Sequence, residues 1–507
     1  MRAIALGFLL LWGALPAQAD WLEAGSDHFV IYSDQKEQSV TQFAERLERF
    51  EAAMARVYKK PRSKPSPSNR VTIFVVADAA EVREVLGRKD RFVAGVYVPR
   101  AGGSVAVIPR LRSASKSQLS GETVLYHEYA HHFMMATLTN RSYPRWFVEG
   151  FAEFFAGARF RQDGTLELGL PPYFRAAELA YAREVPIRSL LDYDGGVSEA
   201  QIGYTSFYGQ SWAMFHYLQM APARAGQIAN YGQQLAAGLP ALEAAMAAFG
   251  DLDQLDKNVE AYLRQRKVSV LAIKQSLLDI GPVSVRRLGP GEADMMPVII
   301  ESKVGVSAEE AKSLVPEARK IAARYPDDPA VLAALAEAEF DAENDDAAIA
   351  AADRALALDA NQINAHLQRG YALERKVEKG ELPRQAWKDV RGQYIKANKV
   401  ENDHPLPLVR FYLTYAKQGE KPSRNAIDGL EWALTLAPFD ASLRWLVAQQ
   451  LIVDERFKEA AQVLGPLAYS PHPGEHTDTA RKLLKEVEAR LQDGDSTNVP
   501  VPSPTGL

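Results

Sequence analysis

The chain has no cysteine among its 507 residues. It therefore contains no disulfide bond and no cysteine that could carry a lipid anchor, so the folded chain must be held together by its hydrophobic core. Histidine is also scarce, with 9 in the whole sequence. Two histidines at close spacing are therefore informative.

The excess of one sign of charge is also small, since 59 Lys and Arg residues face 64 Asp and Glu residues. The formal net charge is −5, and no block of like charge occurs, which excludes the basic footprint of a nucleic-acid-binding protein and a polybasic membrane patch. Hydrophobic residues make up 47% and charged residues 24% of the chain, which is typical of a soluble globular protein. At about 150 residues per domain, the length predicts roughly three domains.

Long hydrophobic runs are missing beyond the N-terminus. The first stretch has one arginine, an apolar run from Ala3 to Leu15, and the small residues Ala17-Gln18-Ala19. This pattern predicts a signal peptide over residues 1–19, cleaved after Ala19. The alternative is a membrane anchor, but the run is shorter than the about 20 residues that a span needs. We expect a periplasmic or secreted protein with no membrane span in the mature chain.

Residues 20–270 predict an α+β domain. Short strands are expected at "HFVIYS", "RVTIFVV", "FVAGVYV" and "GSVAVIP", with a helix between the first two and another near "AAEVREVLG". Two further helices are expected over residues 117–138 and directly after Pro144, which suits a first helical turn. The chain then reads as mostly helical to about residue 265, and residues 271–306 are expected to be a connecting segment between this domain and the C-terminal part.

Residues 307–490 predict an all-α solenoid. Turn positions follow the helical runs at Pro326, Ala360, Pro405, Pro438 and Pro471, with separations of 34, 45, 33 and 33. A step of 34 is the tetratricopeptide length, and the longer step indicates an insertion around "KVEKGELPRQAWKD". Gly370 and Ala-rich positions such as Ala336 and Ala355 suit closely packed helix pairs. A generic helical array is the alternative, and residues 491–507 are expected to be a disordered tail.

The sequence "HEYAH" places His127 and His131 four positions apart. On a helix these two side chains lie on one face, so two imidazole nitrogens can bind one zinc ion. Glu128 lies about 100° round the helix from His127, on the side where a bound water would be. A zinc site needs a third ligand, and Glu149 and Glu153 follow at helical spacing in "YPRWFVEGFAEFFAG".

Together these two motifs resemble the gluzincin metallopeptidases of the peptidase MA type, in which a His-Glu-x-x-His helix precedes a helix bearing "W..EG.A". The resemblance spans roughly residues 20–270 and is strongest over 121–157. It implies a zincin-like fold, Zn²⁺ as cofactor, His127, His131 and Glu149 as zinc ligands, and Glu128 as general base. It also implies an oxyanion donor, for which Tyr208 is favoured over Tyr204, and an edge strand at "GSVAVIP" that holds peptide by backbone pairing.

Other residues near these motifs have simpler interpretations. Glu153 is expected to hydrogen-bond the outer nitrogen of a ligating histidine, with a solvated carboxylate as the alternative. His132 points away from the ligand face. Gly150 would allow the two site helices to approach closely. The remaining residues are expected to pack in the core: His216, Trp146, Phe147, Phe151, Phe154 and Phe155.

The combined prediction is an exported zinc-dependent metallopeptidase that cleaves a peptide or protein substrate and binds a protein partner through its repeats. Two alternatives remain open. One is a catalytically silent, peptidase-like scaffold or assembly protein of the cell envelope. The other is a zinc enzyme that hydrolyses a different amide, such as one in the cell wall.

Overall fold

The computed structural model describes residues 20–87, 95–110, 120–138, 143–191, 205–265, 267–470, 474 and 476–493. The expected signal peptide, Tyr204 and residues 494–507 of the expected tail lie outside these ranges. Residues 491–493 of that tail belong to the last helix. Within the ranges, none of the helices is both long enough and apolar enough to cross a membrane.

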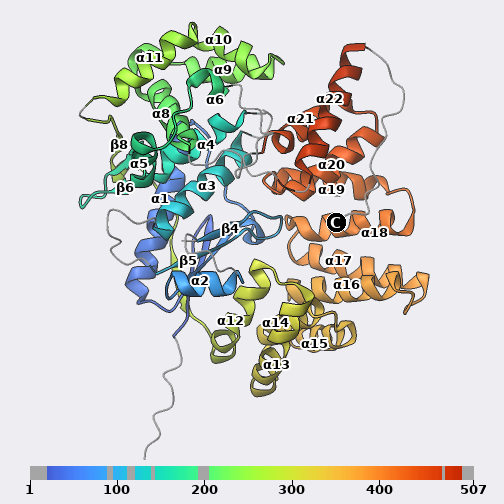
Figure 1. The fold of residues 1–507 in the computed structure, drawn as a ribbon. Coiled ribbons are helices and arrows are strands. Elements are labelled where there is room, and N and C mark those ends of the chain that lie inside the picture. Colours follow the sequence, from blue (N-terminus) through green and yellow to red (C-terminus); the bar gives the residue numbers. More distant parts are fainter. Residues whose placement is uncertain are drawn as a thin grey trace, which may run out of the picture.

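A small mixed sheet forms the centre of the N-terminal part (Figure 1). Its strand order is β4-β5-β3-β2-β1-β9, with β2, β3 and β5 parallel and the other neighbours antiparallel. The strands expected from the sequence are all present, and the bounds are β1 Leu22–Gly25, β2 Phe29–Ser33, β3 Val71–Val76, β4 Val96–Val98, β5 Val105–Pro109 and β9 Ser284–Arg287.

Alternation along the strands gives the sheet two buried faces. On β3, Ile73 and Val75 join the main core with helices α1, α3 and α4, whereas Phe74 and Val76 join a second core with α2 and α12. The bounds of these helices are α1 Glu37–Val57, α2 Ala79–Val85, α3 Gly121–Thr137, α4 Arg145–Ala156 and α12 Pro290–Val304.

The edge of the sheet differs from the expectation. Strand β5, which contains most of "GSVAVIP", lies between β4 and β3 and is therefore an interior strand. The edge strand beside it is β4, antiparallel to β5. The predicted peptide-binding role of "GSVAVIP" is wrong, because both of its sides are already hydrogen-bonded within the sheet.

The rest of the N-terminal part is mostly helical, as expected, with one addition. A three-stranded sheet of order β6-β7-β8 interrupts the helices. Its strands are β6 Arg159–Phe160, β7 Leu166–Leu168 and β8 Leu271–Ile273, and the helices are α5 Tyr173–Tyr181, α6 Ile187–Leu191, α8 Phe207–Met220, α9 Gln227–Ala236, α10 Ala241–Phe249 and α11 Leu252–Leu263.

The segment expected to be a connection, residues 271–306, is structured in three places. Strand β8 pairs with β7, β9 pairs with β1 at the far edge of the main sheet, and α12 packs under that sheet. Helix α12 also contacts α13 and α14. This segment is therefore shared between the sheet and the solenoid.

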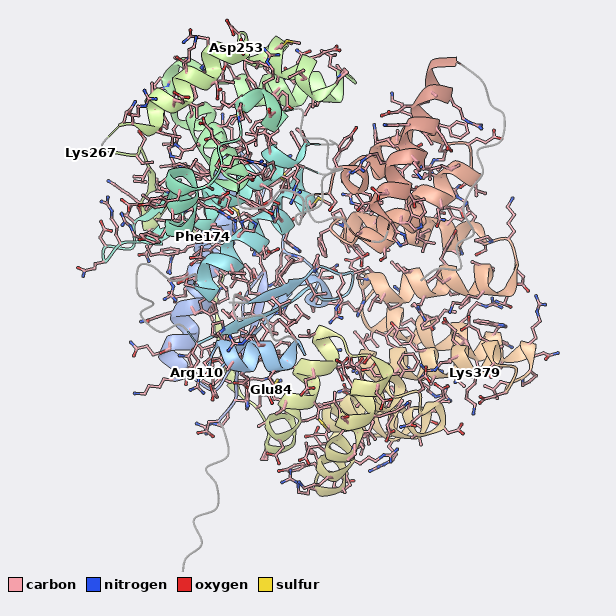
Figure 2. The ribbon with its side chains drawn as sticks, viewed as in Figure 1. Glu84, Arg110, Phe174, Asp253, Lys267 and Lys379 are labelled. Atoms are coloured by element: carbon pink, nitrogen blue, oxygen red, sulfur yellow. The ribbon has the colours of Figure 1, made fainter. Side chains whose placement is uncertain are left out.

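Antiparallel helix pairs form a solenoid beside the N-terminal part (Figure 1). The expected insertion falls between α16 and α17, and Lys379 at its start lies on the outer side of the solenoid (Figure 2). The helix bounds are α13 Ala308–Arg324, α14 Pro329–Asp341, α15 Asp345–Leu358, α16 Ile363–Glu378, α17 Trp387–Val400, α18 Pro405–Gln418, α19 Arg424–Leu436, α20 Ala441–Val453, α21 Phe457–Ala468 and α22 Thr477–Asp493.

Small residues allow close helix packing in both parts. Ala336 and Ala355 are buried between α14 and α15, and a Cβ on Gly370 would lie 2.6 Å from the Tyr394 ring. A Cβ on Gly150 would lie 2.5 Å from the Ser211 carbonyl oxygen of α8. Gly150 therefore serves the contact between α4 and α8, whereas the sequence had suggested the contact between α4 and α3.

We expect Gly150→Ala to lower the free energy of unfolding by about 1 to 3 kcal/mol, because α4 and α8 must separate to admit the methyl group. The matched control is Gly392→Ala in α17, where a Cβ meets nothing within 4 Å. That change should raise stability by about 0.5 to 1 kcal/mol. Thermal unfolding measures both, and equal stability of Gly150→Ala and wild type would show that α4 and α8 are less tightly packed.

Candidate metal centre

Helix α3 positions the two histidines. Ser120 caps its N-terminus, with the Ser120 hydroxyl accepting a hydrogen bond from the Thr123 amide at 3.1 Å. One turn apart on this helix, the Nε2 atoms of His127 and His131 approach to 3.1 Å. Their side chains are 14% and 10% exposed, so both are largely buried.

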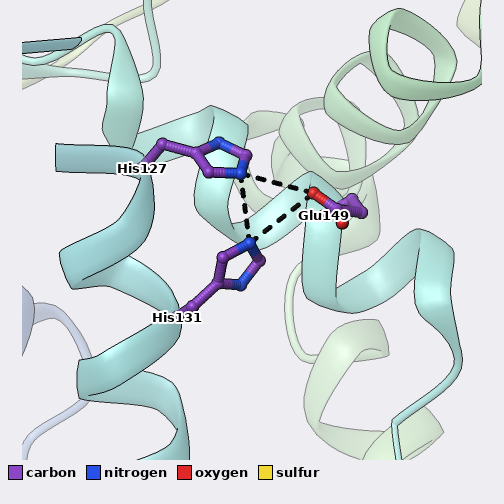
Figure 3. A group of neighbouring side chains, drawn as sticks. All are labelled: His127, His131 and Glu149. Carbon is purple, nitrogen blue, oxygen red and sulfur yellow. Dashed lines mark hydrogen bonds and ion pairs between the residues drawn. The ribbon is translucent and has the colours of Figure 1, made fainter. Parts of the chain in front are cut away.

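Helix α4 supplies a carboxylate to the same point (Figure 3). It begins directly after Pro144, as expected, and all of its residues are buried. Oε2 of Glu149 lies 3.5 Å from Nε2 of His127 and 3.6 Å from Nε2 of His131. The three residues predicted as zinc ligands therefore converge.

The three atoms fit a zinc ion. With separations of 3.1, 3.5 and 3.6 Å, they lie on a circle with a radius of about 2.0 Å, so one point just off their plane is within zinc–ligand distance of all three. Glu149 is 0% exposed, and neither carboxylate oxygen accepts a hydrogen bond from the described residues. Its contacts among the described residues are the two imidazoles at 3.5 and 3.6 Å, and a cation held by all three groups would compensate the buried charge more fully.

The charges of the site act in the same direction. Burial raises the pKa of Glu149, but its interactions with His127 and His131 outweigh burial and hold that pKa well below the usual range. Burial lowers the pKa of His127, but Glu153, Glu149 and Glu128 outweigh burial and raise that pKa to about 9. The site therefore holds an ionised carboxylate and attracts positive charge.

Glu153 lies behind His127, one turn after Glu149. Its Oε1 atom is 3.4 Å from Nδ1 of His127, the nitrogen that faces away from Glu149. It also pairs with Arg175 of α5 at 2.7 Å. This is the geometry of a carboxylate that orients a ligating imidazole.

Glu128 is half-buried on α3 beside the histidine pair. Its charge acts on His127 and also on Tyr97 of the edge strand β4. Its carboxylate is therefore close enough to both residues for its charge to raise their pKa values.

Tyr208 lies in the first turn of α8, between two arginines. Arg145 Nη2 donates to its hydroxyl at 3.2 Å, and the Arg175 guanidinium lies 4.3 Å from the centre of its ring. Arg145 is one turn before Glu149 on α4, and Arg175 contacts Glu153 one turn after it. The Tyr208 ring therefore spans the part of α4 that carries Glu149.

Sequence reasoning missed Arg145, Arg175 and Glu178. Arg175 bonds Glu153 and Glu178, and Glu178 accepts a hydrogen bond from the Tyr208 amide at 3.1 Å. The one local signal is the spacing of Arg175 and Glu178, which suits a helical ion pair. Nothing in that spacing indicates the contact with α4.

The other candidate residues pack as core or interface. His216 is 0% exposed, with its ring nitrogens near the Ser269 carbonyl and the Tyr262 hydroxyl. His132 is partly buried, with its ring 4.2 Å from that of Phe439 in the solenoid. The predicted core aromatics Trp146, Phe147, Phe151, Phe154 and Phe155 are all buried.

A second group of metal-binding residue types has a different explanation. His28, Glu48 and Glu51 lie close together. Arg62 pairs with both carboxylates, and His28 Nδ1 lies 2.9 Å from Glu48. These contacts already compensate the buried charge, so this group is an ion-pair network.

No protein-family profile and no curated protein matches the chain. Several solved structures show weak similarity, including a TPR protein and yeast Tom70. The thermophilic TPR protein TTC0263 of Thermus thermophilus aligns with 15% identity over 39% of this chain and 99% of its own, at a TM-score of 0.32. Yeast Tom70 aligns with 13% identity over 73% of this chain and 71% of its own, at a TM-score of 0.27. These TM-scores are too low to support a conclusion about function.

Zinc binding should depend on pH through His127. Below pH 9 this imidazole is protonated in the metal-free protein, and zinc must displace its proton. This proton alone predicts that the apparent dissociation constant falls about tenfold per pH unit from pH 6 to pH 8. Competition with a zinc chelator measures it, and a constant affinity over this range would contradict the raised pKa.

Replacing Glu149 and Glu153 one at a time should distinguish the zinc ligand from the residue that orients a ligand. Glu149→Ala is expected to lose zinc on dialysis, because it removes one of three ligands. Glu153→Gln should keep zinc but bind it about 10- to 100-fold more weakly, as when the partner of a ligating histidine is changed. Metal analysis of both variants tests this, and full zinc content in Glu149→Ala would exclude Glu149 as a ligand.

Proposed function

We propose that the chain is an exported zinc-dependent metallopeptidase of the gluzincin type. The observation that supports this most is the convergence of His127, His131 and Glu149 from two helices. Two imidazoles and one carboxylate form the ligand set of a catalytic zinc, which keeps one position open, whereas structural zinc sites are closed by four protein ligands.

Zinc bound there would supply Lewis acidity, lowering the pKa of a water molecule to about 7 and polarising a carbonyl. The protein's own groups perform the proton chemistry. Glu128 accepts the proton of the attacking water, and Tyr208 donates a hydrogen bond to the oxyanion that forms. Arg145 holds the Tyr208 hydroxyl at 3.2 Å, so this donor is positioned before substrate arrives.

The substrate surface in this proposal is the edge strand β4. Among the described strands none pairs with its other side, which can therefore bind an extended peptide through backbone hydrogen bonds. Such pairing makes few demands on the peptide sequence. Helix α3, which carries Glu128, contacts β4 and is joined to it by the hydrogen bond between Tyr97 and His132, so the proposed base lies on the helix next to the proposed peptide.

The remaining parts of the proposal concern location and partners. The N-terminal 19 residues have the pattern of a cleavable signal peptide, which supports a periplasmic or secreted enzyme. The helical-repeat solenoid supports a protein-binding module. A catalytically silent scaffold would use the same solenoid, so activity decides between the two functions.

The decisive experiment compares wild type with Glu128→Gln. This change should leave zinc bound and reduce turnover by about 10² to 10⁴, because the general base is lost while all three ligands remain. Zinc content and cleavage of labelled casein and a mixed peptide library are measured together.

The matched control is Glu122→Gln, which changes a glutamate in the first turn of the same helix. Turnover in Glu122→Gln should stay near that of wild type. If wild type binds zinc but cleaves nothing, the scaffold function is favoured. Equal turnover in wild type and Glu128→Gln would remove Glu128 from the mechanism.

A further inference from the structure

The solenoid contacts the tip of the β4–β5 hairpin, residues 99–104. Oδ2 of Asp440, the N-cap of α20, accepts a hydrogen bond from the Ala101 amide at 2.6 Å. Ala101 is 3% exposed and belongs to the same hydrophobic cluster as Leu443 and Leu446 of α20. The hairpin tip is therefore part of the hydrophobic core of the solenoid.

The next residue of the hairpin is fitted to this contact. Gly102 has a φ of +74°, and a Cβ there would lie 2.7 Å from Leu406 and 2.8 Å from His404 at the start of α18. Both the conformation and the space require glycine. In Figure 1 the hairpin reaches the solenoid near α18. Arg100 adds a hydrogen bond to the Lys303 carbonyl of α12.

The same part of the solenoid contacts the helix that carries the two histidines. Phe439, the neighbour of Asp440, places its ring 4.2 Å from the His132 ring on α3. Met135, one turn after His131, packs on the hydrophobic cluster that contains Ala101. Two adjacent residues between α19 and α20 therefore reach both the hairpin and α3.

A third contact links the hairpin and α3 directly. The Tyr97 hydroxyl on β4 is hydrogen-bonded to Nδ1 of His132 at 2.6 Å. These contacts form a closed ring. Tyr97 of β4 bonds His132 of α3, and His132 packs on Phe439. The next residue, Asp440, bonds Ala101 in the turn that follows β4. The ring fixes the distance between β4 and α3, the helix that carries Glu128.

We infer that the β4–β5 hairpin is a ligand of the solenoid, held within the same chain, and that the Phe439–Asp440 segment clamps β4 against α3. An external protein that uses this segment must first displace the hairpin. Between the hairpin, α12, α14 and α16 a cavity of about 730 Å³ remains, lined by residues such as Arg100, Glu337, Asp341 and Tyr371. The clamp therefore covers only one part of the solenoid face.

The test is amide hydrogen exchange in full-length protein carrying Asp440→Asn. Asparagine keeps an oxygen for the Leu443 amide, which Asp440 now caps at 2.8 Å. Its amide group faces Ala101 and cannot accept the Ala101 hydrogen bond. We expect residues 95–105 to exchange about 10- to 100-fold faster, the range for loss of a hydrogen bond to a charged group.

Two further variants complete the experiment. Asp328→Asn is the matched control, since Asp328 caps α14 and accepts from Ala330 and Val331 within its own helix; it should leave residues 95–105 unchanged. Phe439→Ala should speed exchange in residues 121–137. The clamp would be overturned if residues 95–105 in Asp440→Asn and residues 121–137 in Phe439→Ala exchanged at the wild-type rate. The readout needs neither zinc nor turnover, so it is independent of the proposed enzyme function.

Discussion

The structure around the candidate metal centre depends on one ionised carboxylate held in an apolar helix. Glu149 is fully buried, and its helix also carries Trp146, Phe151 and Phe155 in the core. A charge in such surroundings is tolerated only beside compensating groups. The imidazoles of α3 are those groups, which is why α3 and α4 must meet at this turn. Gly150 lets α8 pack closely on the other side of α4, and this packing places Tyr208 of α8 alongside α4.

Much of this centre could be predicted from sequence because its parts repeat at helical spacing. The separation of His127 and His131 fixes their common face, and Pro144 marks where the next helix begins. The arginines could not be predicted in this way. Arg175 reaches Glu153 from α5, and Arg145 reaches Tyr208 on α8. These contacts depend on how the helices pack, which cannot be predicted from the spacing of neighbouring residues in the sequence. Tyr204 and the signal peptide lie outside the described residues and remain predictions.

Strand order was the other failure of sequence reasoning. The pattern of "GSVAVIP" correctly predicted a strand, but its neighbours depend on the whole sheet. β4 covers the side that would have been the edge. In the solenoid too, the elements could be predicted from the sequence but their neighbours could not. Its helix pairs and insertion followed from the periodic turns, whereas its attachment to the hairpin depends on Ala101 and Gly102, which look like an ordinary turn in the sequence. The inner face of a repeat array therefore cannot be assumed free to bind other proteins.

Strand β9 lies far from its partner β1 in the sequence, which affects the order in which the sheet forms during synthesis. Residues Ser284–Arg287 complete the sheet by pairing with Leu22–Gly25 at its far edge. During synthesis β1 and its first partner β2 leave the ribosome early, but its second partner, β9, leaves more than two hundred residues later. Until then β1 is the edge strand on this side of the sheet, and its unpaired backbone groups can associate with other nascent chains. A chain truncated before Ser284 would retain His127, His131 and Glu149 and still leave β1 without its second partner strand.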